Sequence, residues 1–141
     1  MLTSATFDAM TGARLFFKCE NFQKTGAFKS RGAVNAVFGL EEADAQRGVA
    51  THSSGNHGMA LARAAACRGI ECTVVMPETA PRAKVDAVRG YGGQVVFCAP
   101  RNTARQQTLE EIVAASGANV VPPYDDARVK QVRVVDADGV G

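Results

Sequence analysis

Apolar and polar positions follow two periods along the chain, and together they predict alternating strands and helices. Short runs rich in valine and other apolar residues, bounded by glycine or proline, are typical of buried strands, and apolar residues at helical spacing are typical of amphipathic helices. The predicted strands are 15–20, 48–51, 72–76, 94–98 and 119–121. The predicted helices are 28–40, 58–68, 82–88 and 103–116.

This order of elements indicates an α/β fold with a parallel sheet and flanking helices, because strands joined through helices form right-handed crossovers. Gly69 follows the second predicted helix and Pro77 the third predicted strand, as expected of residues that end such elements. Ligands of parallel sheets bind beyond the carboxyl ends of the strands. We therefore expect the binding site in the loop that follows the strand at 48–51.

Composition narrows the possible partners. The 141 residues are 46% apolar, enough for a real core, and 16 basic residues are interspersed with 14 acidic ones. Such a pattern lacks the clustered basic residues that are typical of nucleic-acid or membrane binding, so we expect neither partner. Met1–Ser4 do not resemble a leader, and we expect a cytoplasmic protein. The 4 cysteines form no Cys-x-x-Cys pair, which favours reduced thiols over disulfides or zinc.

The loop Ser53-Ser54-Gly55-Asn56-His57-Gly58 precedes an alanine-rich helix. Small side chains, permissive backbone and the amides of a helix start can hold an anion. An ordinary turn, with Ser or Asn as the N-cap of the helix, is the alternative interpretation. Two hydroxyls, a glycine, an asparagine and a histidine in one turn favour a ligand site.

Lys29 lies in Ala27-Phe28-Lys29-Ser30-Arg31-Gly32, at the start of a predicted helix. A lone lysine is usually solvated. Here the apolar neighbours, together with Lys24 and Arg31, would lower its pKa and favour the neutral amine that forms Schiff bases. His52 and His57 are not spaced as two ligands on one helical face, so we predict no metal site.

These blocks closely resemble eukaryotic serine racemase and the related threonine and serine dehydratases. The first block is Phe16-Phe17-Lys18-Cys19-Glu20-x-x-Gln23-Lys24-Thr25-Gly26-x-Phe28-Lys29-x-Arg31-Gly32-Ala33. The resemblance continues through Thr51-His52-Ser53-Ser54-Gly55-Asn56-His57-Gly58, Met76-Pro77-Glu78-Thr79-Ala80-Pro81 with Lys84, and Tyr91-Gly92. It extends to about Val129, and the combination of the first two blocks is highly specific.

The resemblance implies pyridoxal-phosphate chemistry on serine or threonine, by racemisation, dehydration or both. Lys29 would hold the cofactor as a Schiff base, Phe28 would pack near it, and Asn56 would bond its 3-hydroxyl. The substrate carboxylate would lie on Ser53, Ser54, Gly55, Asn56 and His57. Ser54 would be the second acid or base, on the ring face opposite Lys29.

The resemblance also implies effectors and assembly. Ser4, Lys24 and Thr25 lie where racemases of this type contact a nucleotide at a subunit interface. In full-length members ATP and Mg²⁺ act as effectors, and a homodimer is expected.

The resemblance further divides the chain, with a tryptophan-synthase-β-like fold that is incomplete. Residues 1–47 would be part of the large cofactor-lysine domain, 48–124 the small substrate-binding domain, and 125–141 an atypical tail. The family's tetraglycine phosphate loop is not in this sequence. The alternative is therefore a catalytically inactive truncated fragment, acting at most as a folding or interaction module.

Overall fold

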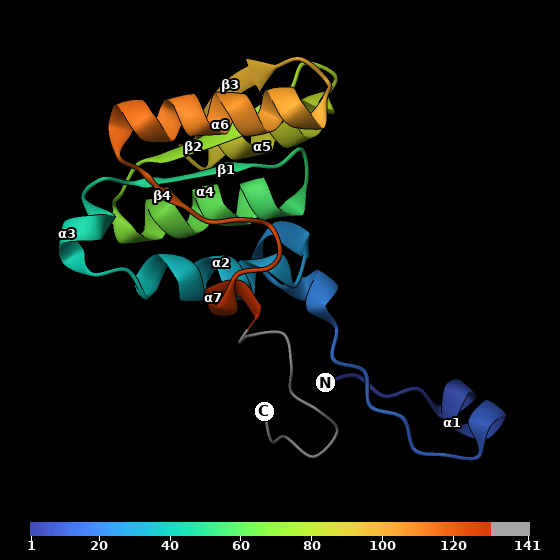
Figure 1. Ribbon diagram of the computed structural model, residues 1–141. Coiled ribbons are helices and arrows are strands. Elements are labelled where there is room, and N and C mark those ends of the chain that lie inside the picture. The colour runs from blue at the N-terminus through green and yellow to red at the C-terminus, as the bar shows by residue number, and fades with distance from the viewer. Residues whose placement is uncertain (131–141) are drawn as a thin grey trace.

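A four-stranded parallel sheet organises the fold, with the strand order β3-β2-β1-β4 (Figure 1). The computed structural model describes residues 1–130. The strands are β1 (Val49–His52), β2 (Cys72–Pro77), β3 (Gln94–Cys98) and β4 (Asn119–Val120). In the register of the sheet, Val49 pairs with Cys72 on one side and with Asn119 on the other. The predicted α/β class and parallel sheet are confirmed.

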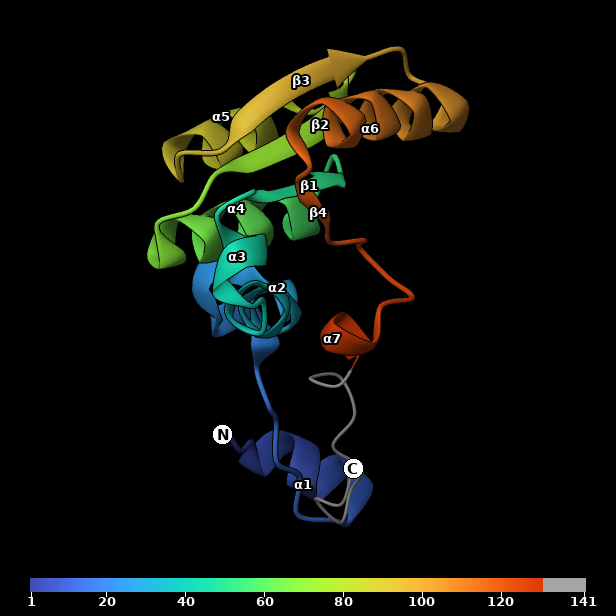
Figure 2. The same ribbon diagram turned by 60° about the vertical axis from the view of Figure 1, so that its left-hand side comes forward.

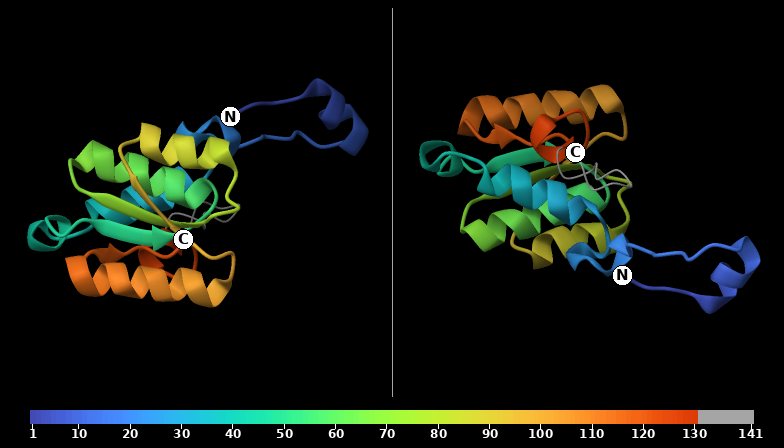
Figure 3. Two further views of the ribbon diagram at one scale, coloured as in Figure 1. Left: turned by 90° about the horizontal axis from the view of Figure 1, so that it is seen from above. Right: turned by 90° about the horizontal axis from the view of Figure 1, so that it is seen from below.

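Helices cover both faces of this sheet, so the core has two parts (Figure 3). The longer helices are α2 (Lys29–Phe38), α4 (Asn56–Arg68), α5 (Arg82–Gly90) and α6 (Asn102–Ser116). Helices α4 and α5 pack on one face and α6 on the other, while α2 packs against α4 as an outer layer. The shorter elements are α1 (Ala5–Thr11), α3 (Glu42–Ala45), α7 (Ala127–Lys130) and the 3₁₀ turns η1 (Glu20–Phe22) and η2 (Lys24–Gly26).

Residues alternate between the two faces along each central strand. In β2, Val74 and Met76 pack in the core under α4, whereas Val75 packs in the core under α6. This alternation follows from the two-residue period of a strand. Both faces are apolar because both are covered, which explains why the strands read as continuous apolar runs.

Close packing of α4 on the sheet depends on its small residues. Five alanines lie in this helix, and Ala60, Ala62, Ala64 and Ala65 are buried. A Cβ on Gly58 would lie 2.9 Å from Cγ1 of Val74, closer than real contacts allow. The first turn of α4 can therefore approach β2 only with glycine at position 58.

The strand predicted at 15–20 is wrong. Residues there form one isolated antiparallel bridge, Leu2 to Phe17, followed by the 3₁₀ turn η1. Residues 1–17 form an arm with the unpredicted helix α1 at its tip, apart from the sheet (Figure 2). A strand needs a neighbouring strand to pair its backbone groups. Within residues 1–130, the segment 15–20 has such a pairing only at Phe17, with Leu2 of the same arm. An apolar run in the sequence does not show whether such a neighbouring strand exists.

The other predicted strands and longer helices are confirmed, with ends that differ by a few residues. The short helices α3 and α7 were not predicted, and α7 lies in the proposed tail, whose residues 131–141 are outside the described part. All 4 cysteines are free, and burial raises the pKa of the Cys72 thiol to about 12. No helix within residues 1–130 is long and apolar enough to cross a membrane.

The core under α4 predicts a clear contrast between two leucines. Leu61 is 0% exposed and Leu2 is 52% exposed. Leu61→Ala should lower the free energy of unfolding by about 3 kcal/mol, through lost burial and a cavity. Leu2→Ala should cost less than about 1 kcal/mol. Urea denaturation of the two variants measures both values, and equal losses would contradict the assignment of the core.

Candidate functional site

The loop after β1 is held by its first serine. The Ser53 amide donates to the Val75 carbonyl at 3.0 Å, which ties the loop to β2. The Ser53 hydroxyl accepts from the amides of Gly55 at 3.3 Å and Gly58 at 3.2 Å. Ser53 thus satisfies amides at the start of α4, although the N-cap position itself is Gly55.

Ser54 is placed differently. Within residues 1–130 its half-buried hydroxyl makes no hydrogen bond, and it faces a cavity of about 390 Å³. The residues that line this cavity are His52, Ser53, Ser54, Gly55, Asn102, Arg105, Gln106, Pro123 and Tyr124. They come from the chain that follows β1, β3 and β4, at the carboxyl ends of these strands. The expected location of the binding site is thereby supported by the cavity.

Lys29 reaches the same region from the first turn of α2. Its amine donates to the Pro123 carbonyl, and Pro123 lines the cavity beside Ser54. The nitrogen also lies 5.3 Å from the centre of the Phe28 ring, in a cation–π contact. The segment at Pro123 therefore connects the two blocks that the sequence singled out.

His57 is a buried histidine, 3% exposed, at the start of α4. Its Nε2 lies 2.9 Å from the Val121 carbonyl, so Nε2 carries the hydrogen and donates. Burial lowers the pKa of His57 to about 4, and the charges of Lys29 and His52 act in the same direction against the raising effect of the Val121 bond. The side chain is thus a neutral link between α4 and the end of β4, and a contact of His57 with a carboxylate would use its backbone and stays a prediction.

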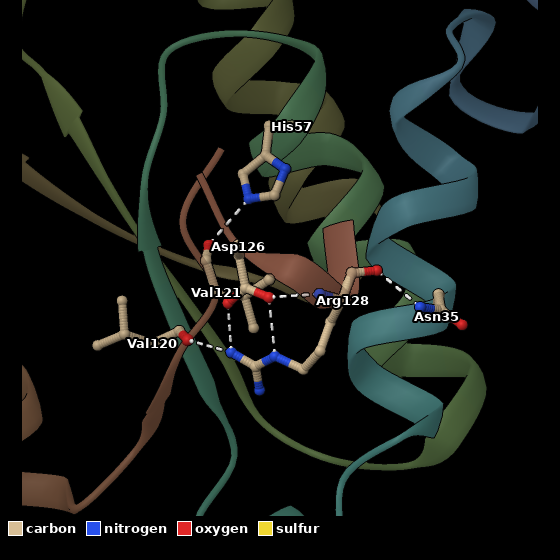
Figure 4. A network of polar contacts seen from close by, with 6 residues as sticks. All are labelled: Asn35, His57, Val120, Val121, Asp126 and Arg128. Carbon is tan, nitrogen blue, oxygen red and sulfur yellow. Dashed lines mark hydrogen bonds and ion pairs between the residues drawn. The ribbon is translucent and has the colours of Figure 1, made fainter. Parts of the chain in front are cut away.

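A polar network fixes the chain beyond β4 (Figure 4). The Arg128 guanidinium pairs with both Asp126 oxygens, at 3.0 and 2.6 Å, and donates to the Val120 carbonyl at 3.3 Å. This pairing lowers the pKa of the Asp126 carboxyl. Asn35 of α2 donates to the Arg128 carbonyl at 2.6 Å. The segment that carries Pro123 is therefore anchored to both α4 and α2.

Asn56, the first residue of α4, is exposed and contacts the neighbouring helix α5. Its Oδ1 accepts from the Lys84 amine at 2.8 Å. The structure thus joins the loop to a lysine that the sequence analysis mentioned only as part of a motif.

The three residues considered for a nucleotide lie in two places. Ser4 caps α1 on the arm, where it accepts from the Phe7 amide at 3.4 Å. Thr25 lies in η2 with φ 67°, and its hydroxyl is 2.8 Å from that of Ser30. Lys24 lines a second cavity of about 390 Å³ at α2. A nucleotide role for this set stays a prediction.

The sequence analysis missed Arg105 and did not connect His52 with the site. Arg105 enters the cavity from α6, and its buried Nε has no hydrogen-bond partner within residues 1–130. Burial, and then the charge of Arg105, lowers the pKa of His52. Arg105 lies just after β3, so the rule that places ligands at strand ends could have identified it. Among residues 1–130, no group of three or more histidine, cysteine or acidic side chains could hold a metal ion.

Comparison with known proteins gives a consistent result. Residues 1–135 match the family model described as pyridoxal-phosphate dependent enzyme. The chain is 58% identical over 127 residues to the β-hydroxyaspartate dehydratase of Paracoccus denitrificans. This match covers 90% of this chain and 40% of the relative.

Two solved structures are also similar. The serine racemase of Dictyostelium discoideum has a TM-score of 0.87 and 44% identity, over 91% of this chain and 42% of that one. A pyridoxal 5'-phosphate-dependent aspartate racemase has a TM-score of 0.81 and 47% identity, over 91% of this chain and 40% of that one. The chain spans about 40% of the length of the curated relatives that it matches.

The neutral state of His57 predicts how stability depends on pH. The unfolded histidine takes up a proton below its ordinary pKa of 6.5, whereas the folded one stays neutral to about 4. Stability should therefore fall as the pH drops from 6.5 towards 4, by on the order of 1 kcal/mol per pH unit. His57→Gln should flatten this fall in urea denaturation across that range. His52→Gln is the control, because the pKa of His52 is also lowered. If stability fell with pH as steeply in His57→Gln as in the parent chain, the prediction would be contradicted.

Proposed function

The chain belongs to the pyridoxal-phosphate dependent enzymes, and we propose that it carries the cofactor lysine and the substrate loop for elimination from, or racemisation of, serine or threonine. The observation that carries this proposal is the meeting of two groups at one segment. The Lys29 amine donates to Pro123, and Pro123 lines the cavity that the Ser54 hydroxyl faces. A lysine and a hydroxyl near one cavity are the two groups that this chemistry needs.

The residues present fit part of the cofactor. Lys29 is half-buried beside Phe28, which suits an amine that must bond a carbonyl carbon. Asn56 offers amide hydrogens to the 3-oxygen. Bound pyridoxal phosphate would supply a ring that spreads the charge left when the α-proton is removed.

The loop fits the carboxylate that every amino acid carries, and Arg105 fits a second anion beside it. Ser53 holds the turn closed, and Ser54 and Gly55 line the cavity with polar backbone and side-chain groups. The unpartnered Nε of Arg105 adds a buried donor with positive charge. A buried donor without a partner is costly, and an anion would satisfy it.

Ser54 would decide between the two reactions. Removing and returning the α-proton on opposite faces requires two acid–base groups, for which Lys29 and Ser54 are the candidates. Elimination of the β-hydroxyl requires only one base. The free hydroxyl of Ser54 supports its assignment to the second role, whereas Ser53 is already used by the backbone.

A second candidate function is the same elimination from a 3-hydroxy amino acid with an acidic side chain. Arg105 and the half-buried His52 both line the cavity beside Ser54, so it can attract a second carboxylate. The relative named β-hydroxyaspartate dehydratase and the structure named aspartate racemase point the same way.

Other parts of the proposal concern the whole protein. ATP and Mg²⁺ as effectors, a homodimer, a cytoplasmic location and the division into domains at 47 and 124 are inferred from the family. The competing proposal is a catalytically inactive truncated fragment, which would act at most as a folding or interaction module. Assays of the purified chain for pyruvate and D-serine separate these possibilities.

Lys29 is tested first by cofactor attachment. The purified chain is mixed with pyridoxal phosphate, reduced with borohydride, and the modified lysine is located by peptide mass spectrometry. Lys29 should carry the label, and Lys29→Ala should lose both the visible absorbance band and any turnover, because the Lys29 amine contacts the cavity segment at Pro123. Lys18→Ala, an exposed lysine paired with Glu20 at 3.7 Å, is the matched control.

A graft makes the result independent of the activity of the isolated chain. The matching 127 residues of the Paracoccus denitrificans dehydratase are replaced by those of this chain, which is 58% identical there. Retained turnover in the Lys29→Ala graft would refute the assignment.

The two substrate classes are separated by Arg105. Arg105→Met in the graft should lower kcat/KM for 3-hydroxyaspartate by about 100-fold, the effect of one lost buried charge-assisted pair. Serine should be affected much less, because it has no second carboxylate. Arg101→Met, an exposed arginine at the same helix end, is the control. Equal losses on both substrates would favour serine or threonine as the natural class.

A further inference from the structure

The contact between Lys84 and Asn56 fixes which edge of the Asn56 amide is available to a ligand. Lys84 lies in the first turn of α5, three residues after Pro81, and is half-buried. Its amine donates to Asn56 Oδ1 at 2.8 Å. Among the described residues it forms no ion pair, so a neutral amide is the partner that the fold gives to this charge.

An ammonium group has only donors, whereas a carboxamide has one accepting and one donating edge. Lys84 can therefore bond only the oxygen of Asn56. With Oδ1 held in this way, Nδ2 and its two hydrogens are left for other partners. The orientation of this amide is thus set by chemistry and needs no ligand.

We propose that Lys84 is a positioning residue, which orients the Asn56 amide so that it presents donors to the 3-oxygen of the cofactor. This inference rests on the proposed function, in which Asn56 contacts that oxygen. A donor edge and a nearby positive charge both favour the oxygen as an anion over the protonated hydroxyl. Without Lys84 the amide can turn over, and its accepting edge then favours the protonated form.

The position of Lys84 gives α5 a part in the site. Helix α5 packs on α4 and β3 and contributes no residue to the cavity beside Ser54. Through Lys84 it nevertheless acts on the first residue of α4. The structure thereby explains a lysine of the family-like motif that the cavity leaves unassigned.

The test compares variants of the full 141-residue chain. Lys84→Met removes the charge, and Lys84→Arg keeps a cation that can only donate. Arg82→Met is the matched control, because it also removes one positive charge from the first turn of α5. The Arg82 side chain is 94% exposed and pairs with Asp86 at 3.7 Å. Two readouts are used: the ¹H–¹⁵N resonances of the Asn56 side-chain amide without cofactor, and titration with pyridoxal phosphate.

Lys84→Met should shift the Asn56 amide resonances, while Arg82→Met and Lys84→Arg leave them near those of the parent. In the titration, Lys84→Met should weaken cofactor binding by about tenfold, the loss of one charge-assisted hydrogen bond, and move the absorbance towards the protonated 3-hydroxyl form. Lys84→Arg should restore both. A merely structural role of Lys84 would not change the ratio of the two absorbance forms.

Any other result of these experiments would refute either the contact, the role of Lys84 towards the cofactor, or the proposed function. Unchanged Asn56 resonances in Lys84→Met would refute the contact. Shifted resonances with unchanged affinity and absorbance would refute its role towards the cofactor, and so would a parent chain that takes up no cofactor. A Lys29→Ala chain that keeps the absorbance band would refute the proposed function instead, whatever Lys84→Met shows.

Discussion

The site depends on how the fold satisfies the backbone carbonyls of one irregular segment. Beyond β4 the chain leaves the sheet, and its carbonyls lose the regular partners of a strand. Side chains from other elements replace them: His57 bonds Val121, Lys29 bonds Pro123, and Arg128 bonds Val120. Two of these donors, His57 and Lys29, belong to the blocks that carry the proposed chemistry. The contacts that hold this segment in place therefore also position the residues of the proposed site.

Charge and burial act together on this region. His57 is neutral because burial and nearby positive groups oppose its protonation, so it donates one hydrogen and adds no charge. Positive charge is left to Lys29 and Arg105, which come from different helices. An anion that enters the cavity would meet Arg105 and Ser54, and Lys29 lies nearby through its contact with Pro123. The arrangement favours carboxylates, and the number of carboxylates is what distinguishes the two proposed substrate classes.

The tight packing of α2, α4 and α7 transmits these constraints. A Cβ on Gly32 would lie 3.0 Å from Cγ1 of Val129, a tight contact, so a larger residue at position 32 would push α7 away from α2. Lys29 lies on the same helix, less than one turn away. The glycine of the lysine block thus has a packing reason that is independent of catalysis, and it helps to hold the segment that Lys29 contacts.

Local sequence determined the elements of the core. The short apolar runs of β1 to β3, bounded by glycine or proline, and the alanine stripe of α4 were enough to predict these elements, because both faces of the sheet are buried. The Lys29 block and the Ser53–Gly58 loop were also singled out from the sequence, and the cavity beside Ser54 lies at the strand ends where a site was expected. In contrast, the strand predicted at 15–20 required a neighbour that no local pattern provides.

Tertiary structure alone decided which side chains meet. Ser53 and Ser54 are adjacent and chemically identical, yet the Ser53 hydroxyl accepts from the Gly55 and Gly58 amides, whereas the Ser54 hydroxyl makes no hydrogen bond within residues 1–130. Arg105 and Pro123 join Ser54 from distant parts of the chain, and Lys84 joins Asn56 across two helices. Sequence determines local propensity, but contacts between distant residues depend on how strand ends converge in the folded sheet, and no single segment contains that information.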